Sequence, residues 1–246
     1  MQGRSKKRGL NSANRQPRET PSDRGMSERA FDIEKKSFKI IDAEAGDHDY
    51  NELEWDIVRR VIHATADFDF VTKSKIIFRK DALDAGFNAI KSKCTIVTDV
   101  DMVLSALNKK SLSALGLRAV CHVSNKDLVE VSSRLNKTRS EMAMRYAANE
   151  MNAGIVLIGN APTALFETIR MINEGTTKPA LVIGIPVGFV SAAESKEELS
   201  KTEIPFITNR GRKGGSAAAS SIMNALMLLH QKQRPITKTD INYSIG

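Results

Sequence analysis

A short apolar run, followed at once by a glycine loop and the start of a helix, constrains this chain most. Ile155–Ile158 is wholly apolar, which is typical of a strand buried on both faces of a parallel sheet. Residues 159–163 have turn chemistry, and Pro162 suits the first position of a helix that the apolar spacing of residues 164–172 predicts. Open α/β sheets bind ligands at such loops, through free backbone N–H groups at the carboxyl end of a strand.

The same order of elements recurs twice further along the chain. The predicted strand, loop and helix cover residues 180–185, 186–189 and 192–199, and then residues 204–208, 209–216 and 217–230. Each loop contains glycine and could by itself be an ordinary β–α turn. Three such loops together favour a site at which they converge on one anionic or polar ligand.

Upstream segments extend the alternation of helices and strands. Apolar spacing predicts helices over residues 31–43, 52–64, 80–92, 126–135 and 141–151, and strands over residues 94–98 and 118–123. Thr138 is expected to cap the fifth of these helices, with Glu141 completing a capping box. The whole pattern predicts an α/β fold with a mostly parallel sheet of about five strands.

Composition excludes several classes of protein. No run approaches the ~18 apolar residues of a membrane span, and Cys94 and Cys121 both lie in apolar runs, as expected for buried, inert thiols in a reducing cytoplasm. Of the net charge of +8, residues 1–30 supply a surplus of five, with eight basic and three acidic side chains. The remainder is too weakly basic, and too poor in aromatic residues, to indicate nucleic-acid binding.

The distribution of apolar residues predicts one folded domain between two tails. Residues 1–26 are basic and almost free of apolar side chains, so we expect a disordered tail that is either solvated, a targeting segment or an electrostatic contact. The domain is expected over residues 27–236. Residues 237–246 are polar and are expected to form a frayed C-terminus.

Several polar side chains near predicted element ends are candidates for a site. His63 ends the helix predicted over residues 52–64, where the helix dipole favours a charged imidazole. Asp67 and Asp69 follow it and would either orient it or be solvated. Asp99 and Asp101 follow a strand, as a metal site or a general base would require, but no third metal ligand is in view.

Two further candidates are a histidine and an arginine. His122 alternates with apolar neighbours and is expected in the core or in a pocket wall. Arg139, beside the predicted cap, would either clamp a carboxylate with two parallel hydrogen bonds or be an ordinary surface residue.

Taken together, the ordered motifs resemble the precorrin-8X methylmutase family, which includes the cobalt-precorrin-8 methylmutases of cobalamin synthesis. The similarity runs from about residue 34 to residue 226. The motifs that carry it are Glu34-Lys-Lys-Ser-Phe38, Arg60-Val-Ile-His-Ala64, Asp99-Val-Asp-Met-Val103, Thr138-Arg-Ser140, Ile158-Gly-Asn-Ala-Pro-Thr-Ala-Leu165, Pro186-Val-Gly-Phe-Val190 with Ala193-Glu-Ser-Lys196, and Gly211-Arg-Lys-Gly-Gly-Ser216.

The resemblance implies a three-layer α/β/α sandwich, a cytoplasmic homodimer and an isomerase. The implied reaction moves a methyl group from C-11 to C-12 of the corrinoid substrate, precorrin-8X or cobalt-precorrin-8, and gives hydrogenobyrinate or cobyrinate. It needs no cofactor and no metal site. The catalytic histidine falls on His63, and the substrate-binding positions fall on Ser37, Asn108, Arg139, Ser140, Gly159, Asn160, Thr163, Gly188, Gly214, Gly215 and Ser216.

One stretch departs from the family pattern. Ala106 stands where the family usually has glycine, and Asn108 stands where some members contribute a threonine. Two other functions remain open from the sequence: a corrinoid-binding or carrier protein without turnover, and a nucleotide-binding α/β protein. The second is disfavoured because residues 211–216 lack the G-x-x-x-x-G-K-[ST] spacing of a phosphate loop.

Overall fold

The structure, a computed structural model, describes residues 27–233. These residues fall into two units, the first ending at Ile40 and the second beginning at Ile41. The first unit is the greater part of helix α1 (Glu28–Glu44), within which the Ser37 hydroxyl donates a hydrogen bond to the carbonyl of Ile33 at 2.9 Å. The predicted tail over residues 1–26 and the predicted C-terminus over residues 237–246 lie outside the described residues, so the single domain over 27–236 stays a prediction.

The second unit is built on a six-stranded sheet with the order β1-β6-β5-β4-β2-β3. Five strands are parallel, and β1 joins one edge antiparallel to β6. The strands are β1 (Ile76–Phe78), β2 (Thr95–Thr98), β3 (Arg118–Cys121), β4 (Ile155–Ile158), β5 (Leu181–Gly184) and β6 (Phe206–Asn209). The predicted α/β class and mostly parallel sheet are confirmed. The sequence analysis missed β1 because a three-residue strand is too short to show a period.

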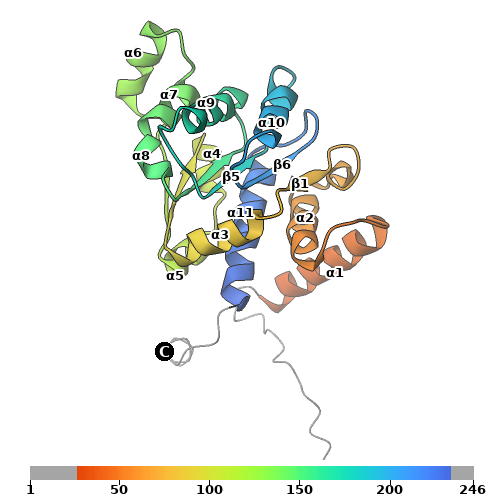
Figure 1. Cartoon of the computed structure of the whole chain (residues 1–246). Coiled ribbons are helices and arrows are strands. Elements are labelled where there is room, and N and C mark those ends of the chain that lie inside the picture. Colours follow the sequence, from red (N-terminus) through yellow and green to blue (C-terminus); the bar gives the residue numbers. More distant parts are fainter. Residues whose placement is uncertain (1–26, 234–246) are drawn as a thin grey trace, which may run out of the picture. The chain divides into compact units, whose positions relative to one another are not determined.

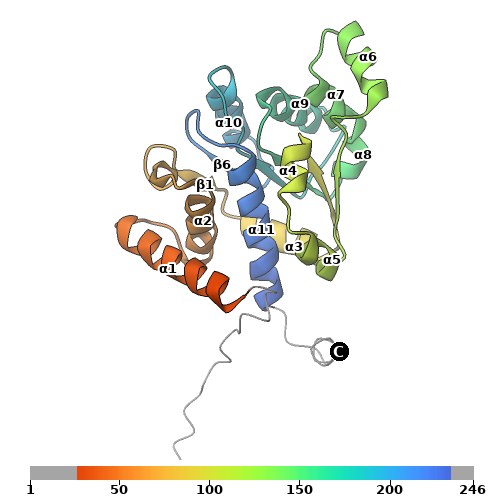
Figure 2. The same ribbon diagram turned by 180° about the vertical axis from the view of Figure 1, so that it is seen from behind.

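Helices cover both faces of this sheet, which makes the predicted three-layer sandwich. Figures 1 and 2 show α7, α9 and α10 on one side of the strands and α3 and α11 on the other, where α11 also packs against α2. The helices are α2 (Glu52–Thr65), α3 (Ala82–Lys91), α4 (Asp101–Ser105), α5 (Lys109–Leu115), α6 (Lys126–Arg134), α7 (Arg139–Tyr146), α8 (Ala148–Met151), α9 (Pro162–Asn173), α10 (Ala192–Ser200) and α11 (Ser216–Gln233), with a short 3-10 turn, η2 (Phe68–Phe70).

The two central strands are buried on both faces, as their sequence predicts. All four residues of β4 are inaccessible to solvent, and those of β5 are buried as well. Gly184 lets the helices approach closely, because a Cβ atom there would lie 2.7 Å from the Leu199 side chain on α10 and 3.1 Å from the Leu165 side chain on α9. This packing fixes where the loops that follow these strands begin.

The predicted capping box begins α7. The Thr138 hydroxyl accepts a hydrogen bond from the Glu141 N–H at 3.1 Å, and the Glu141 carboxylate accepts one from the Thr138 N–H at 2.8 Å. The predicted helix over residues 141–151 is divided near Ala147 into α7 and α8. The cap satisfies backbone donors that would otherwise be unpaired at the start of α7.

A buried carboxylate links α7 to α9. The Glu167 side chain is only 2% exposed, and its carboxylate accepts hydrogen bonds from Arg145 Nε at 2.6 Å and Arg170 Nη2 at 2.5 Å. Burial by itself raises the pKa of Glu167, but the two guanidinium groups outweigh it, so the pKa lies below its ordinary value. The ionised form therefore stabilises the folded state.

We expect Glu167→Gln to lower the free energy of unfolding at pH 7 by about 1–3 kcal/mol, because it removes a charged acceptor from two arginines. The wild-type advantage should shrink as pH falls below the ordinary glutamate pKa of 4.5, since a carboxyl whose folded pKa is lowered loses its contribution on protonation. Urea titrations at pH 7 and at about pH 3.5 measure both effects. Glu174→Gln, at an exposed partner of Arg170, is the control; an equal loss in both variants would contradict the assignment.

Candidate active site

The three glycine loops come together at one edge of the sheet. They follow β4, β5 and β6, which are neighbours and parallel, so all three leave from the same edge. The Gly188 N–H donates to the Arg212 carbonyl at 3.1 Å, and the Gly215 N–H donates to the Ile185 carbonyl at 2.9 Å. A Cβ atom at Gly159 would lie 2.9 Å from Ser216 Cα. The convergence expected from the sequence is therefore present.

The loop after β4 is closed by a buried carboxylate. Asp99, at the end of β2, accepts hydrogen bonds from the N–H groups of Gly159 at 3.1 Å, Asn160 at 2.8 Å and Ala161 at 2.7 Å. Burial raises the pKa of Asp99, and the three amide donors act in the opposite direction. Because all three donors are used within the protein, this loop does not offer them to a ligand, contrary to our expectation of free N–H groups there.

Asp99 and Asp101 consequently have different roles. Asp99 Oδ1 accepts one backbone hydrogen bond and Oδ2 accepts two, so the carboxylate holds the loop after β4. Asp101 is exposed and accepts a hydrogen bond from the Ser124 hydroxyl at 2.5 Å. Within residues 27–233, no group of three or more His, Cys, Asp or Glu side chains could hold a metal.

The loop after β6 keeps its backbone donors open. In the part of the chain that the structure describes, the N–H groups of residues 211–214 and of Ser216 and Ala217 have no hydrogen-bond acceptor. Gly214 has a φ of +156°, and a Cβ atom there would lie 2.3 Å from the Ile185 carbonyl oxygen, so no other residue fits. A row of amides ahead of the 18-residue helix α11 is suited to binding an anion.

Two buried side chains support this loop from below. Lys196, on α10, donates from Nζ to the Lys213 carbonyl at 2.6 Å and to Asn209 Oδ1 at 3.1 Å, while Asn209 Nδ2 donates to the Lys213 carbonyl at 2.9 Å and to the Arg210 carbonyl at 3.0 Å. Burial lowers the pKa of Lys196 to about 8. In the sequence, Lys196 stood out only as part of a family motif. Its place on the buried side of a short polar helix is the signal that could have identified it as a buried cation.

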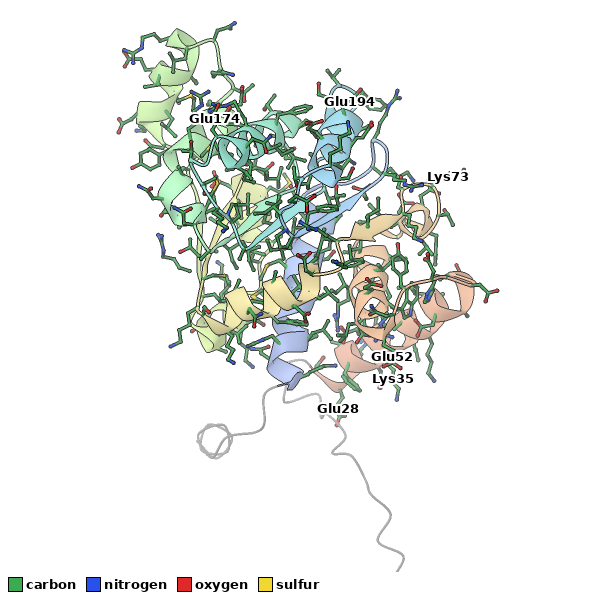
Figure 3. All side chains as sticks on the ribbon, in the orientation of Figure 1. Glu28, Lys35, Glu52, Lys73, Glu174 and Glu194 are labelled. Carbon is green, nitrogen blue, oxygen red and sulfur yellow. The ribbon has the colours of Figure 1, made fainter. Side chains whose placement is uncertain are left out.

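An ion pair ties the same loop to the end of α2. Lys213 Nζ lies 2.7 Å from both Asp67 Oδ2 and Asp69 Oδ2. The two carboxylates thus pair with Lys213. The sequence had suggested instead that they orient His63 or are solvated. His63 is exposed and lies in the last turn of α2, which is capped by Ala66 in the left-handed conformation. In Figure 3, Glu194 marks the start of α10 and Lys73 the loop after η2, which flank the β6 loop.

The starts of α7 and α9 meet beside these loops. The hydroxyl groups of Thr138 and Thr163 are hydrogen-bonded at 2.9 Å, which joins the two helix N-termini. Arg139 is the first residue of α7 and is exposed, and Ser140 is half-buried. Asn160 is exposed at the neighbouring loop. These predicted substrate-binding residues are thus close to one another in the fold.

Asn108 makes hydrogen bonds that hold the local structure. Its side-chain oxygen caps α5 by accepting from the Ser111 N–H at 2.9 Å, and its own N–H donates to Asn224 on α11 at 2.9 Å. Asn224 also donates to the Ala106 carbonyl at 3.0 Å. The two residues that depart from the family pattern therefore anchor this stretch to α11. Substrate contact by Asn108, and by Ser37 of the first unit, stays a prediction.

Exposed apolar side chains, missed by the sequence analysis, border the loops. Phe189 is 86% exposed and Val190 is 81% exposed after β5, and Met102 is 71% exposed after β2. The Arg212 guanidinium lies 5.7 Å from the centre of the Phe189 ring. Apolar groups next to open amide donors suit a ligand with a large unsaturated ring and anionic substituents.

Other features of the described residues lie away from this edge. A cavity of about 920 Å³ opens at the opposite edge, where Ala153, Ala180 and Pro205 precede β4, β5 and β6, so it does not share a ligand with the loops. Cys94 and Cys121 are free thiols whose pKa values burial raises to about 11. Between residues 27 and 233, no helix is long and apolar enough to cross a membrane.

We expect Asp99→Ala to lower the free energy of unfolding by at least about 3 kcal/mol, because it leaves three amide donors without their acceptor. The matched change Asp101→Ala, at an exposed carboxylate two residues away, should cost less than about 1 kcal/mol. Urea unfolding of the two variants measures the difference. Similar losses would show that Asp99 does not hold the β4 loop.

Comparison with known proteins identifies the family. A sequence model described as precorrin-8X methylmutase matches residues 32–229. The chain is 48% identical over 209 residues to a cobalt-precorrin-8 methylmutase of Leptospira interrogans, covering 82% of this chain and 94% of the relative. It is 49% identical over 197 residues to the same enzyme of Priestia megaterium, covering 80% and 87%.

A solved structure agrees with the sequence comparison. The precorrin-8X methylmutase from Thermus thermophilus superimposes with a TM-score of 0.74 at 38% identity, covering 81% of this chain and 98% of that structure. The sheet order, the converging loops and these similarities concern the same residues. The chain belongs to the precorrin-8X methylmutase family and is an isomerase of cobalamin biosynthesis.

Proposed function

We propose that this protein moves a methyl group from C-11 to C-12 of precorrin-8X or cobalt-precorrin-8, giving hydrogenobyrinate or cobyrinate. The observation that carries the proposal is the β6 loop, whose open amide donors face the shared edge and which Lys213 links to the helix end that bears His63. A corrinoid has acetate and propionate arms, which such donors bind, and a broad ring, which the exposed apolar side chains can cover.

The reaction sets narrow demands on the protein. The bond from the methyl carbon to C-11 breaks as its bond to C-12 forms, so no external nucleophile or leaving group takes part. The protein supplies the shape that holds the ring and a proton or strong hydrogen bond that draws electron density from it. Histidine is suited to this because its ordinary pKa lies near neutrality.

The residues take complementary roles in this proposal. Protonated His63 donates to the macrocycle near ring C. Arg139 and the amides of the β6 loop hold the anionic arms, with Gly214 giving the backbone its close approach. The further substrate contacts proposed from the family are Ser37, Asn108, Ser140, Gly159, Asn160, Thr163, Gly188, Gly215 and Ser216. Of these, Gly159 and Asn160 have their N–H groups engaged by Asp99, so contact there would be made by other atoms.

We also propose that the enzyme acts as a homodimer in the cytoplasm, as its family resemblance implies. Exposed apolar side chains such as Phe189 and Val190 support further burial of this edge, by substrate or by a second copy. The two free cysteines suit a reducing compartment.

Incubation with metal-free and cobalt-containing precorrin-8 tests the function directly. Methyl migration leaves the mass of the corrinoid unchanged and alters its visible spectrum. The form of precorrin-8 whose spectrum changes is the substrate. Tight binding without any spectral change would instead support a carrier.

We expect His63→Asn to fold and bind the corrinoid while its turnover falls ~10²–10⁴-fold, the usual contribution of a general acid. His230→Asn, near the end of another helix, is the control and should keep its turnover. Single-turnover absorbance changes, together with thermal melting, separate chemistry from stability. A folded His63→Asn variant with near-normal turnover would reject the role given to His63.

For Arg139, the change to lysine keeps the charge but loses the two-pronged geometry. We expect Arg139→Lys to weaken binding of the corrinoid product roughly 10-fold, about the value of one charged hydrogen bond. Fluorescence or calorimetric titration measures the affinity. The control is Arg134→Lys at the end of α6; equal affinities in all three proteins would remove Arg139 from the site.

A further inference from the structure

Lys196 is a buried cation without a carboxylate partner. Its side chain lies on α10 with 1% exposure, and both of its hydrogen-bond acceptors, Asn209 Oδ1 and the Lys213 carbonyl, are neutral. No ion pair is formed with it by any described residue. Glu197, the one acid that lines the same cavity of about 550 Å³, lies 3.6 Å from Lys201. Burying a charge without a counter-charge is costly, so its retention needs a reason.

The ammonium group is not required to satisfy the loop beneath which it lies. The Lys213 carbonyl also accepts a hydrogen bond from Asn209 Nδ2 at 2.9 Å, and Asn209 Nδ2 bonds the Arg210 carbonyl as well. A neutral residue of similar length would leave both carbonyl groups paired. Beyond the hydrogen bond to Asn209 Oδ1, what Lys196 adds is therefore its positive charge.

The Lys196 ammonium group bonds the carbonyl side of a peptide unit whose N–H group is open. The Lys213 carbonyl and the Gly214 N–H belong to one peptide unit, and within residues 27–233 this N–H has no acceptor. A cation at the carbonyl oxygen polarises the peptide and strengthens the N–H on its other side. The arrangement favours an anion at the outer face of the β6 loop.

We propose that Lys196 is a positioning residue for a carboxylate of the substrate: it acts through the peptide between Lys213 and Gly214, and the bound carboxylate supplies its missing counter-charge. The inference rests on the proposed function, because the corrinoid brings the acetate and propionate groups. It adds a residue that does not touch the substrate but sets how strongly the loop binds it.

Charge balance at the loop agrees with this role. Lys213 is already neutralised by Asp67 and Asp69, whereas Arg210 and Lys196 line the cavity and form no ion pair with another described residue. A ligand carboxylate therefore meets a positive field. The other charged side chains that line the cavity are Glu197 and Arg210.

Proton uptake on binding follows from the burial of Lys196. In the free protein burial holds its pKa at about 8, below the ordinary value of 10.5. A nearby carboxylate raises that pKa again. Above pH 8 the free protein has a neutral amine that becomes charged on binding, so binding takes up a proton and weakens as pH rises; at pH 6.5 the amine is already charged and contributes none.

Calorimetric titration with hydrogenobyrinate, in two buffers of different ionisation enthalpy, measures this uptake. For wild type we expect close to one proton at about pH 9 and almost none from Lys196 at pH 6.5. In Lys196→Met the uptake at pH 9 should vanish and the affinity at pH 7 should fall roughly 10- to 100-fold. Its melting temperature does not decide between the readings, because Met removes a buried charge and also the donor to the buried Asn209 Oδ1.

Two controls isolate the effect. Lys201→Met makes the same change in net charge at the exposed residue that follows α10 and should bind as wild type. His63→Asn tests whether the imidazole takes up the proton instead; if Lys196 takes it up, this variant retains the uptake at pH 9.

The outcomes separate this inference from the proposed function. Wild-type binding without proton uptake at pH 9 overturns the inference alone, as does a Lys196→Met variant with normal affinity. If Lys196→Met fails to fold, the proton uptake of wild type and of His63→Asn at pH 9 still tests the inference. Absence of any corrinoid binding by wild type overturns both.

Discussion

The bond between Asp99 and three consecutive amides fixes the working edge of this protein. The carboxylate lies at the end of β2 and holds the loop that leaves β4, so it joins two neighbouring strands where their chains turn away from the sheet. The loop is then rigid and its donors are occupied. Because the N–H groups of the first loop are taken by Asp99, the open backbone donors at this edge are those of the loop after β6.

At the β6 loop, the buried side chains donate hydrogen bonds to the backbone, whereas Asp99 accepts them. Lys196 and Asn209 bond its carbonyl groups from below, which turns its N–H groups outward. Gly214 is pressed against the Ile185 carbonyl, where a side chain would not fit. A glycine loop at this edge is thus closed where the buried polar group beside it accepts hydrogen bonds and open where that group donates them.

Ion pairs made by Lys213 hold the end of the helix that carries His63 beside the β6 loop. Lys213 in the β6 loop bridges Asp67 and Asp69, which follow the helix that carries His63. The packing of α2 against α11 supports the same placement, since α11 begins directly after the loop. An exposed bridge alone contributes little stability, so its value is in fixing the position of a helix end that local propensity leaves undetermined.

The sequence by itself determined the class of fold and the convergence of the three glycine loops. The buried run of β4, the proline that opens α9 and the capping box of α7 are local signals, and each depends on residues a few positions apart. Short elements such as β1 escaped because three residues show no period. Tertiary structure alone decided that Asp99 consumes the amides of one loop while Lys196 exposes those of another. Those contacts join residues 17 to 62 positions apart, and no local pattern records which partner a buried polar group will meet.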